Sequence, residues 1–530
     1  MNYADLFRVT LPETALEVAA LVVLIVDLGF LRKAALNLRV KVAALLGVAG
    51  CGAAFWNLQT AAAVQSKIWG PGFRFDAEML LGQGGYITAA QSGILILTAL
   101  TLLLLIDSDF TKHVGEFAAI VLMAASGGLL VAAAQDLLVI FVGLELLSLS
   151  LYIMTAFAKS SAKSAEAALK YYLFGGMSAA FLLFGFSYFY GLSGTTNLSG
   201  IQDAITQSRP SPLFYAAWIL VIAGLGFKVA AVPFHLWAPD TYEGAPAPAA
   251  AFIASVSKVA GFALLLSFSL YWLYPGSATG GETHWFAIYL QRSFQTWQDL
   301  GSILFIVAAA SVVTGNLAAL AQASVRRLLA YSAIAHAGYM LLGVASQRAY
   351  SGQATPIDFW RSTWGVPLAT ANAVLYYILT YGLTTIGAFG VVSVVERVTG
   401  SDRLDSFLGL HKRNPLLAAV LLVLFLSLAG IPPLVGFWAK FNLFAAVLGV
   451  SAGPVPFALV ALAIAMSTVS LYYYLQVLKR AYVMPAIDET PIKAHPVTMA
   501  VLLVIAAAVV ILGCFPSLLQ SWIQSFYPIA

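Results

Sequence analysis

Long apolar runs recur along the whole chain and restrict its fold more than any other feature. Each run is about 20 residues long or longer, which is the length that a helix needs to cross the hydrocarbon core of a bilayer. The runs lack the alternation of apolar and polar residues that is typical of strands in a membrane barrel. The sequence therefore predicts an all-α polytopic membrane protein with about fourteen transmembrane spans. Their predicted limits are 13–31, 40–58, 86–106, 115–134, 137–157, 167–191, 212–236, 246–274, 298–320, 327–346, 366–395, 415–448, 454–478 and 496–515.

The composition agrees with a chain that lies mostly in lipid. Charged residues make up 9% of the 530 residues, whereas about 25% is usual for a soluble globular domain. The net charge of +4 is too small to indicate binding to nucleic acid. The lipid bilayer is therefore the predicted environment of the chain, and nucleic acid is not a predicted partner.

Lysine and arginine residues are unevenly distributed between the two sets of loops. If the N-terminus lies outside, the cytoplasmic loops hold sixteen of the 27 basic residues and the outer loops hold seven. Cytoplasmic loops of membrane proteins usually carry the excess of lysine and arginine, so both termini are predicted to lie on the outer side. The remaining four basic residues, Lys170, Lys228, Lys258 and Lys440, fall within predicted spans.

Two of the spans contain prolines that are expected to break a helix. Pro233 lies in the seventh span after Lys228, and Pro432 and Pro433 lie in the twelfth span before Lys440. Proline removes a helical hydrogen bond and clashes with the preceding turn. The two breaks are five spans apart, and a repeat of an odd number of spans is inserted upside down the second time. Paired broken helices of this kind indicate a transport site built on inverted repeats.

Five ionisable residues lie at membrane depth on five different predicted spans: Glu145, Lys228, Lys258, His336 and Lys440. Ionisable groups inside a membrane are energetically costly and often mark pathways for ions or protons. A single Glu145–Lys228 pair could equally be a structural ion pair that locks two helices together. A series of five favours a proton relay, in which His336 suits an intermediate position because the ordinary pKa of histidine is about 6.5.

Two further residues are candidates for accessory roles. His235 lies near the predicted cytoplasmic end of the seventh span, where it could supply protons to Lys228 or cap the broken turn through a backbone carbonyl. Lys170 lies near the start of the sixth span, where it could extend to the cytoplasmic surface or turn inward to Glu145. We expect the inward orientation. Asp240 and Glu243 follow in a loop, where a solvated or helix-capping role is expected.

Sequence motifs for redox cofactors and metal ions are absent. The chain contains no GxGxxG segment after a strand, no phosphate-binding loop, no CxxC pair and no HExxH segment, which are the patterns that such groups require. Any redox chemistry is therefore expected to take place in another polypeptide.

Four segments resemble those of the antiporter-like subunits of proton-pumping NADH–quinone oxidoreductase, respiratory complex I. They are VGLELLSLSLYIM, FKVAAVPFHLWAPDTYEGAPAPAAAFIASVSK, YSAIAHAGYM and SLAGIPPLVGFWAKF. The resemblance covers nearly the whole chain and is greatest to the subunit N type. The subunit L type carries a long lateral helix after the shared core, whereas this sequence ends soon after its last span. The subunit M type typically has a glutamate where this chain has Lys440.

The resemblance implies a role for each ionisable residue of the spans. Glu145 and Lys228 match the coupling pair of that family, and Lys258 matches its central relay lysine. Lys440 matches the basic group nearest the outer exit, and His336 matches a position that bridges the two halves. Lys170 matches a lysine close to the glutamate.

The resemblance also implies a domain organisation. The inverted repeats of the family comprise spans 4–8 and 9–13. On this basis residues 1–110 form an N-terminal three-helix segment, residues 111–275 the first repeat, residues 276–482 the second and residues 483–530 the last span.

The function implied by the resemblance is proton translocation across a bacterial plasma (inner) membrane, coupled to NADH oxidation and quinone reduction in other subunits. The expected partners are other membrane subunits of complex I, including a neighbouring antiporter-like subunit. NADH, FMN, iron–sulfur clusters and quinone are expected in partner subunits, and no cofactor is expected on this chain. The alternative is a subunit of a multi-subunit cation/proton antiporter, which shares the fold.

Overall fold

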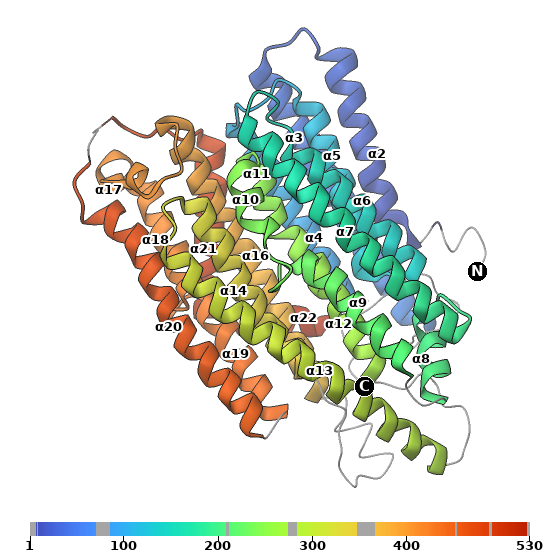
Figure 1. Cartoon of the computed structure of the whole chain (residues 1–530). Helices are drawn as coiled ribbons and strands as arrows, with labels where there is room; N and C mark the ends of the chain where they lie inside the picture. Colours follow the sequence, from blue (N-terminus) through green and yellow to red (C-terminus); the bar gives the residue numbers. More distant parts are fainter. Residues whose placement is uncertain are drawn as a thin grey trace.

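The computed structural model describes residues 7, 9–69, 85–207, 211–273, 283–346, 366–450, 453–486 and 490–526. Nearly all of these residues are helical, and the only extended pairings among them are two isolated β-bridges, Asp136–Asn197 and Ser324–Arg403. The helices, labelled as in Figure 1, are α2 (Leu11–Ile25), α3 (Leu36–Trp69), α4 (Gly85–Leu104), α5 (Val114–Ala133), α6 (Leu137–Thr155), α7 (Ala162–Ser193), α8 (Leu198–Gln207), α9 (Pro212–Val229), α10 (Trp237–Gly244), α11 (Ala247–Ala254), α12 (Val256–Leu273), α13 (Thr283–Leu320), α14 (Val325–Ala345), α16 (Val366–Thr399), α17 (Leu410–Arg413), α18 (Pro415–Ala429), α19 (Val435–Val450), α20 (Pro454–Tyr482), α21 (Pro496–Cys514) and α22 (Ser517–Ser525).

The predicted all-α polytopic membrane fold is confirmed. Within the described residues, 12 helical segments are long and apolar enough to cross a membrane. The shorter apolar helices α18 and α19 together form the predicted twelfth span. Helix α2 has 15 residues and continues into a short π-helix, Val26–Phe30, and the two together form the first span. Each predicted span thus corresponds to one helix or to a pair of consecutive helices.

Several predicted boundaries were wrong. The helix of the seventh span ends at Val229, well before the predicted limit of 236, because the chain turns sharply there. Helix α3 continues to Trp69 instead of ending near residue 58. The amphipathic helices α8 and α22 were not predicted at all, because they lie outside the long apolar runs. The predicted outer loop 347–365 lies outside the described residues.

The two predicted helix breaks share one local geometry. Helix α9 ends at Ala230 and helix α18 ends at Gly430, and both residues adopt the left-handed backbone conformation, with φ of 58° and 87°. Each is followed by a cis peptide bond to proline, Val232–Pro233 in the first case and Pro432–Pro433 in the second. The structure therefore places a turn, not a continuous helix, beside Lys228 and before Lys440.

A third interruption, in the eighth span, was not predicted. Helices α11 and α12 are separated at Ser255, whose backbone angles are φ −118° and ψ −75°. The Ser255 hydroxyl donates to the carbonyl of Ala251 at 2.6 Å. No proline marks this position, so the sequence pattern predicted a continuous helix. The interruption lies one turn before Lys258.

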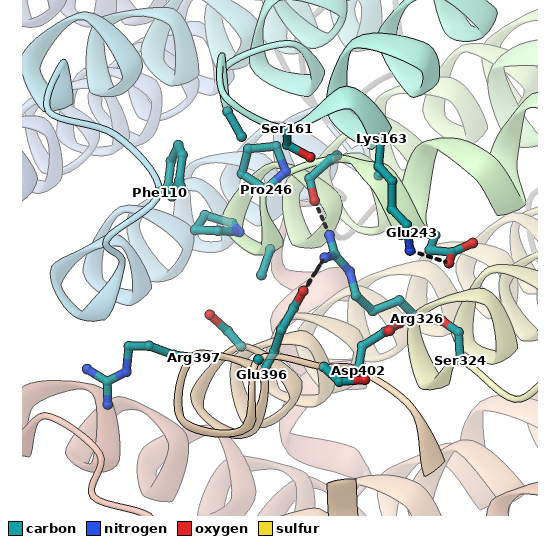
Figure 2. A pocket seen from close by; sticks show the side chains of 18 of the residues that line it. Phe110, Ser161, Lys163, Glu243, Pro246, Ser324, Arg326, Glu396, Arg397 and Asp402 are labelled. Carbon is teal, nitrogen blue, oxygen red and sulfur yellow. Dashed lines mark hydrogen bonds and ion pairs between the residues drawn. The ribbon is translucent and has the colours of Figure 1, made fainter. Parts of the chain in front are cut away.

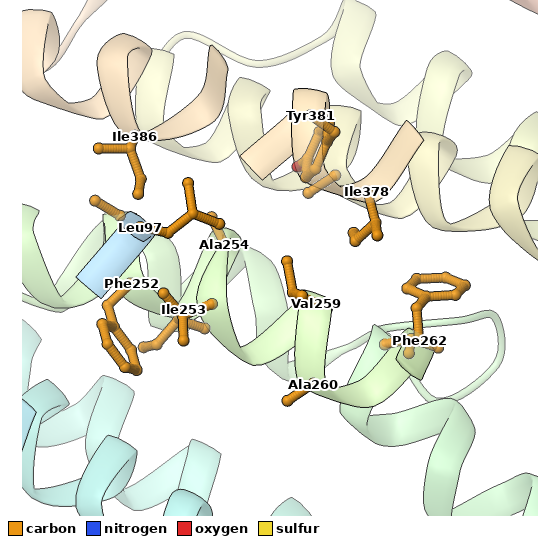
Figure 3. Close-up of a cluster of buried hydrophobic side chains, with 14 of the residues drawn as sticks. Leu97, Phe252, Ile253, Ala254, Val259, Ala260, Phe262, Ile378, Tyr381 and Ile386 are labelled. Atoms are coloured by element: carbon orange, nitrogen blue, oxygen red, sulfur yellow. The ribbon is translucent and has the colours of Figure 1, made fainter. Parts of the chain in front are cut away.

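The pair α11–α12 occupies the centre of the molecule. It packs against α4, α5, α9 and α16, and in its most apolar stretch 100% of the residues are buried. In Figure 1 the early helices α2, α5, α6 and α7 lie on one side of it and α18, α19 and α20 on the other. Figure 3 shows the apolar core around it, where Val259 and Phe262 of α12 face Ile378 and Tyr381 of α16.

The outermost helices expose large apolar side chains. Leu21 of α2, Phe184 of α7 and Phe457 of α20 are 59%, 60% and 66% exposed. Soluble proteins rarely expose extended apolar faces, so lipid or neighbouring membrane subunits are expected to cover these helices.

Candidate functional site

Lys228 lies in the last turn of α9 and is buried. Its ammonium group donates a hydrogen bond to the hydroxyl of Ser148 on α6. Ser148 lies one helical turn after Glu145, so both side chains face the same neighbouring helices. Ser148 was not among the residues predicted from the sequence, although its spacing from Glu145 was a usable signal.

Glu145 is half-buried on α6 and lies close enough to act electrostatically on Lys228. Among the described residues, however, its carboxylate forms no hydrogen bond or ion pair. The structure therefore brings the predicted Glu145–Lys228 pair into the same region of the molecule without joining the two side chains. The ammonium of Lys228 is held by a neutral hydroxyl instead.

Lys258 lies in the first turn of α12 and is 1% exposed. Its Nζ donates to the carbonyl oxygen of Ala333 on α14 at 2.6 Å. The same Nζ lies 5.9 Å from the ring centroid of Tyr381 on α16, a distance at which an aromatic ring attracts a cation. Lys258 lies on the last helix of the predicted first repeat. It thus contacts two helices of the predicted second repeat, α14 and α16.

His336 lies on α14, one turn after Ala333, and is also buried. Its Nδ1 is 2.8 Å from the hydroxyl of Tyr377, and its Nε2 is 3.3 Å from the hydroxyl of Tyr474. Its ring centroid is 4.8 Å from that of Tyr381. Tyr381 therefore contacts both His336 and Lys258, and the three tyrosines form most of the polar surroundings of the imidazole.

Lys440 lies on α19 and interacts with the broken end of α18. Its Nζ donates to the carbonyls of Leu428 and Ala429 at 3.1 and 2.9 Å, and to the hydroxyl of Ser467 on α20 at 2.8 Å. A helix that ends leaves its last carbonyls without helical partners, and its C-terminus attracts a cation. The break at Gly430 therefore creates the acceptors that hold Lys440.

His235 lies in the turn between α9 and α10 and is buried, and its Nδ1 has no hydrogen-bond partner among the described residues. Both predicted roles, the supply of protons to Lys228 and the cap on the broken turn, stay predictions.

The predicted inward orientation of Lys170 was wrong. Its Nζ lies 2.7 Å from Oε1 of Glu166 and 2.7 Å from Oδ2 of Asp240, and not against Glu145. Glu166 is one helical turn earlier on the same helix, and Asp240 is on α10, so two carboxylates compete successfully for this lysine. Lys170 therefore joins α7 to α10 at the end of the molecule, as part of a surface ion-pair network.

That network also includes Arg327, whose Nη1 lies 2.5 Å from Asp240 and 3.0 Å from Glu243. Asp240 and Glu243 are thus paired residues of the helix α10. Of the two roles expected from the sequence, solvated or helix-capping, the solvated one was wrong. Partial burial alone would raise the pKa of Asp240, but the hydrogen bonds and charges of Lys170 and Arg327 outweigh it and lower this pKa.

The ion pairs of Asp240 are expected to stabilise the protein in a pH-dependent way. A carboxyl whose pKa is lowered on folding contributes stability above its ordinary pKa, and this contribution is lost as the pH falls through the lowered pKa. Asp240→Asn is therefore expected to lower the thermal unfolding midpoint in detergent at pH 7. The difference from the unmodified protein should shrink between about pH 5 and about pH 3. A difference that does not change with pH would contradict this assignment.

A pocket of about 820 Å³ lies at the same end of the molecule, between segments that the sequence assigns to cytoplasmic loops. Figure 2 shows Arg326 in this pocket, joined by dashed lines to the backbone on one side and to Glu396 on the other. The side chain of Arg326 donates to the carbonyls of Tyr242 and Ala245 and pairs with Glu396 at 3.1 Å. From the sequence, Arg326 was expected to be a charged residue of a cytoplasmic loop. In the structure its side chain is buried, with 4% exposed.

The described part of the chain contains no group of three or more histidine, cysteine, aspartate or glutamate side chains that could hold a metal ion. The residues that the structure brings together are instead lysines, a histidine and hydroxyl groups inside a multi-pass membrane protein.

Comparison with known proteins gives one consistent family. The profile of the transmembrane family described as NADH:quinone oxidoreductase/Mrp antiporter matches residues 134–289, 283–360 and 364–467. NADH-quinone oxidoreductase subunit N 2 of Acidobacterium capsulatum is 46% identical over 99% of both chains. Subunit N 1 of Roseiflexus castenholzii is 40% identical, over 89% of this chain and 83% of its own.

A solved structure agrees. One chain of respiratory complex I from Thermus thermophilus with bound aureothin is 32% identical and superposes with a TM-score of 0.70, covering 96% of this chain and 98% of its own. The chain therefore belongs to the NADH:quinone oxidoreductase/Mrp antiporter transmembrane family, in its subunit N branch.

Proposed function

We propose that the chain is a membrane-arm subunit of NADH–quinone oxidoreductase that moves protons from the cytoplasmic to the outer side of a bacterial inner membrane. NADH oxidation and quinone reduction take place in other subunits, which hold the redox cofactors. This chain acts as a non-redox part of the translocase, and its protons pass along Glu145, Lys228, Lys258, His336 and Lys440.

The observation that carries this proposal is the way in which the three buried lysines are held. Lys228, Lys258 and Lys440 are between 1% and 9% exposed, and none of them forms an ion pair with a carboxylate among the described residues. Their partners are neutral oxygens: the hydroxyls of Ser148 and Ser467 and backbone carbonyls. Structural ion pairs therefore do not account for these lysines.

Neutral partners suit a proton carrier. When a lysine in a buried ion pair loses its proton, it leaves an unpaired carboxylate, which is strongly unfavourable in a low-dielectric interior. A lysine held by hydroxyls and carbonyls leaves no such charge behind.

Glu145 can then control the proton affinity of Lys228. Its carboxylate is available on the same helix as Ser148, so movement of α6 relative to α9 can exchange the hydroxyl for the carboxylate as the partner of Lys228. Because an adjacent negative charge favours the charged lysine, this exchange couples conformation to proton affinity.

Lys228→Ala and Lys258→Ala test the relay. Each is expected to lower the number of protons moved per NADH oxidised, and with it the coupled quinone reductase activity, because each removes one group that carries the proton. Proton uptake and NADH oxidation would be measured together in membrane vesicles, with assembly of the complex checked on native gels. An unchanged proton stoichiometry in both variants, with assembly intact, would rule out the relay.

A second candidate function is that of a subunit in a cation/proton antiporter, which the description of the matching family includes. An antiporter would exchange Na⁺ or K⁺ for protons without NADH or quinone. Ion exchange by liposomes that contain this chain without complex I partners would support that function. Dependence of proton movement on NADH oxidation in the native membrane would support the first.

A further inference from the structure

We propose that Asn316 is an insulating link between the tyrosines beside His336 and the hydroxyl groups beside Lys440, and that it prevents protons from flowing freely between these two relay residues. This inference rests on the proposed relay and adds a residue to it. Asn316 lies near the end of α13 and is 0% exposed.

Polar side chains can be followed from His336 to Asn316. Nε2 of His336 lies 3.3 Å from the hydroxyl of Tyr474, and the ring centroid of Tyr474 is 4.5 Å from that of Tyr473. The hydroxyl of Tyr473 donates to Oδ1 of Asn316 at 3.1 Å, and Nδ2 of Asn316 donates to the hydroxyl of Tyr339 at 3.0 Å.

Lys440 lies on the other side of Asn316. Its Nζ donates a hydrogen bond to the hydroxyl of Ser467 at 2.8 Å. The ring centroid of Tyr339 also lies 5.6 Å from the same Nζ. Polar side chains from α20, α13 and α14 therefore lie between the two relay residues, and Asn316 is hydrogen-bonded on both sides.

The orientation of the Asn316 amide is fixed by its surroundings. Besides Tyr339, its Nδ2 donates to the backbone carbonyl of Val312 at 2.8 Å. A carbonyl can only accept, so the nitrogen and not the oxygen must face Val312. It follows that Tyr473 directs its proton toward Asn316, whereas Tyr339 accepts from Asn316 and directs its own proton elsewhere.

A carboxamide in this position transmits hydrogen-bond order but not protons. A hydroxyl accepts one proton and releases another at the same oxygen, so a row of hydroxyls can pass protons along. To do the same, Asn316 would have to form an O–H bond at Oδ1 and break an N–H bond at Nδ2, which yields an imidic acid. The amide therefore interrupts proton hopping between Tyr473 and Tyr339 until the chain rearranges around it.

The replacement Asn316→Asp tests this directly, because it keeps the size of the side chain and makes it able to take up and release protons. In membrane vesicles that contain the assembled complex, it is expected to raise passive proton leak several-fold and to lower the protons moved per NADH. Electron transfer from NADH to quinone should continue. Asn316→Leu, which cannot carry a proton, should show no increase in leak.

The matched control is Asn57→Asp on α3, a half-buried asparagine away from the chain of hydroxyls. It should leave both leak and stoichiometry unchanged. Equal effects of the aspartate and leucine replacements at residue 316 would show that Asn316 serves packing alone and would overturn the inference.

Two more variants separate this inference from the relay itself. If Lys440→Met stops pumping but Asn316→Asp has normal leak and stoichiometry, the inference fails and the relay stands. If Lys440→Met pumps normally, the relay itself fails. If Asn316→Asp does not assemble, Tyr339→Phe removes the next hydroxyl without adding charge. It should slow coupled turnover without leak, and normal turnover in that variant would also overturn the inference.

Discussion

Replacing Lys440 with methionine is expected to reduce proton pumping by the assembled complex roughly tenfold or more, because the last proton carrier before the outer side is lost. Methionine has a similar volume and suits a buried position, so the packing of α19 is largely kept. The two carbonyls at the end of α18, Leu428 and Ala429, lose their donor at the same time. A second replacement is needed to separate this capping role from proton transfer.

Arginine at residue 440 provides that separation. A guanidinium keeps the positive charge and can donate to the same carbonyls, but it does not release its proton in proteins. If Lys440 acts only as a cap for the broken helix, Lys440→Arg should restore pumping. If it carries protons, Lys440→Arg should be as inactive as Lys440→Met.

The control for both is Lys412→Met, an exposed lysine on α17. It should pump normally. The readout is the rate of NADH-driven proton uptake in vesicles, divided by the amount of assembled complex. Full pumping by Lys440→Arg with normal stoichiometry would contradict a proton-carrying role for Lys440.

The features that the sequence predicted correctly depend on local signals. Pro233 and Pro433 remove helical hydrogen bonds wherever the chain folds, so the two breaks could be placed without a structure. Lysines in long apolar runs are costly at any position in a membrane, so Lys228, Lys258 and Lys440 could be singled out from their surroundings alone.

The features that the sequence did not predict depend on how helices face one another. Tyr381, Tyr377 and Tyr474 read as ordinary residues of apolar spans, and only the rotation of α16 and α20 turns their side chains toward His336. No proline lies at the interruption at Ser255, so no local sequence signal predicts it. Glu145 on the neighbouring helix was the predicted partner of Lys170, but Lys170 pairs instead with two carboxylates at the end of the bundle.

The surroundings of Arg326, a charged residue near the membrane surface, also could not be predicted from the sequence. Counting lysines and arginines in loops treats each as solvated, whereas the guanidinium of Arg326 is buried and contacts Tyr242 of α10 and Glu396 of α16. In the sequence, Arg326 was used only to predict which side of the membrane its loop faces. Its position in the structure indicates that it also joins α10 of the predicted first repeat to α16 of the predicted second.

Arg326→Met is expected to destabilise the protein by about 3 kcal/mol, because it leaves two buried backbone carbonyls without a donor, at about 1 to 3 kcal/mol each. The replacement leaves the carbonyls of Tyr242 and Ala245 without this donor and Glu396 without its partner. Unsatisfied acceptors away from water are unfavourable. The midpoint of thermal unfolding in detergent should fall clearly. Arg403→Met, which removes an exposed arginine from the same pocket, should change it little.

A double-mutant cycle with Glu396→Gln identifies which contacts of Arg326 carry the effect. If the carboxylate dominates, Arg326→Met should destabilise the Glu396→Gln protein much less than it destabilises the unmodified one. We expect the opposite, because Glu396 is 33% exposed and water can replace its partner, whereas the two carbonyls are held by the buried part of the guanidinium. Most of the loss should therefore persist in the Glu396→Gln background. That result would assign Arg326 to fastening the backbone of α10 beside α14, and with it the turn that follows Lys228.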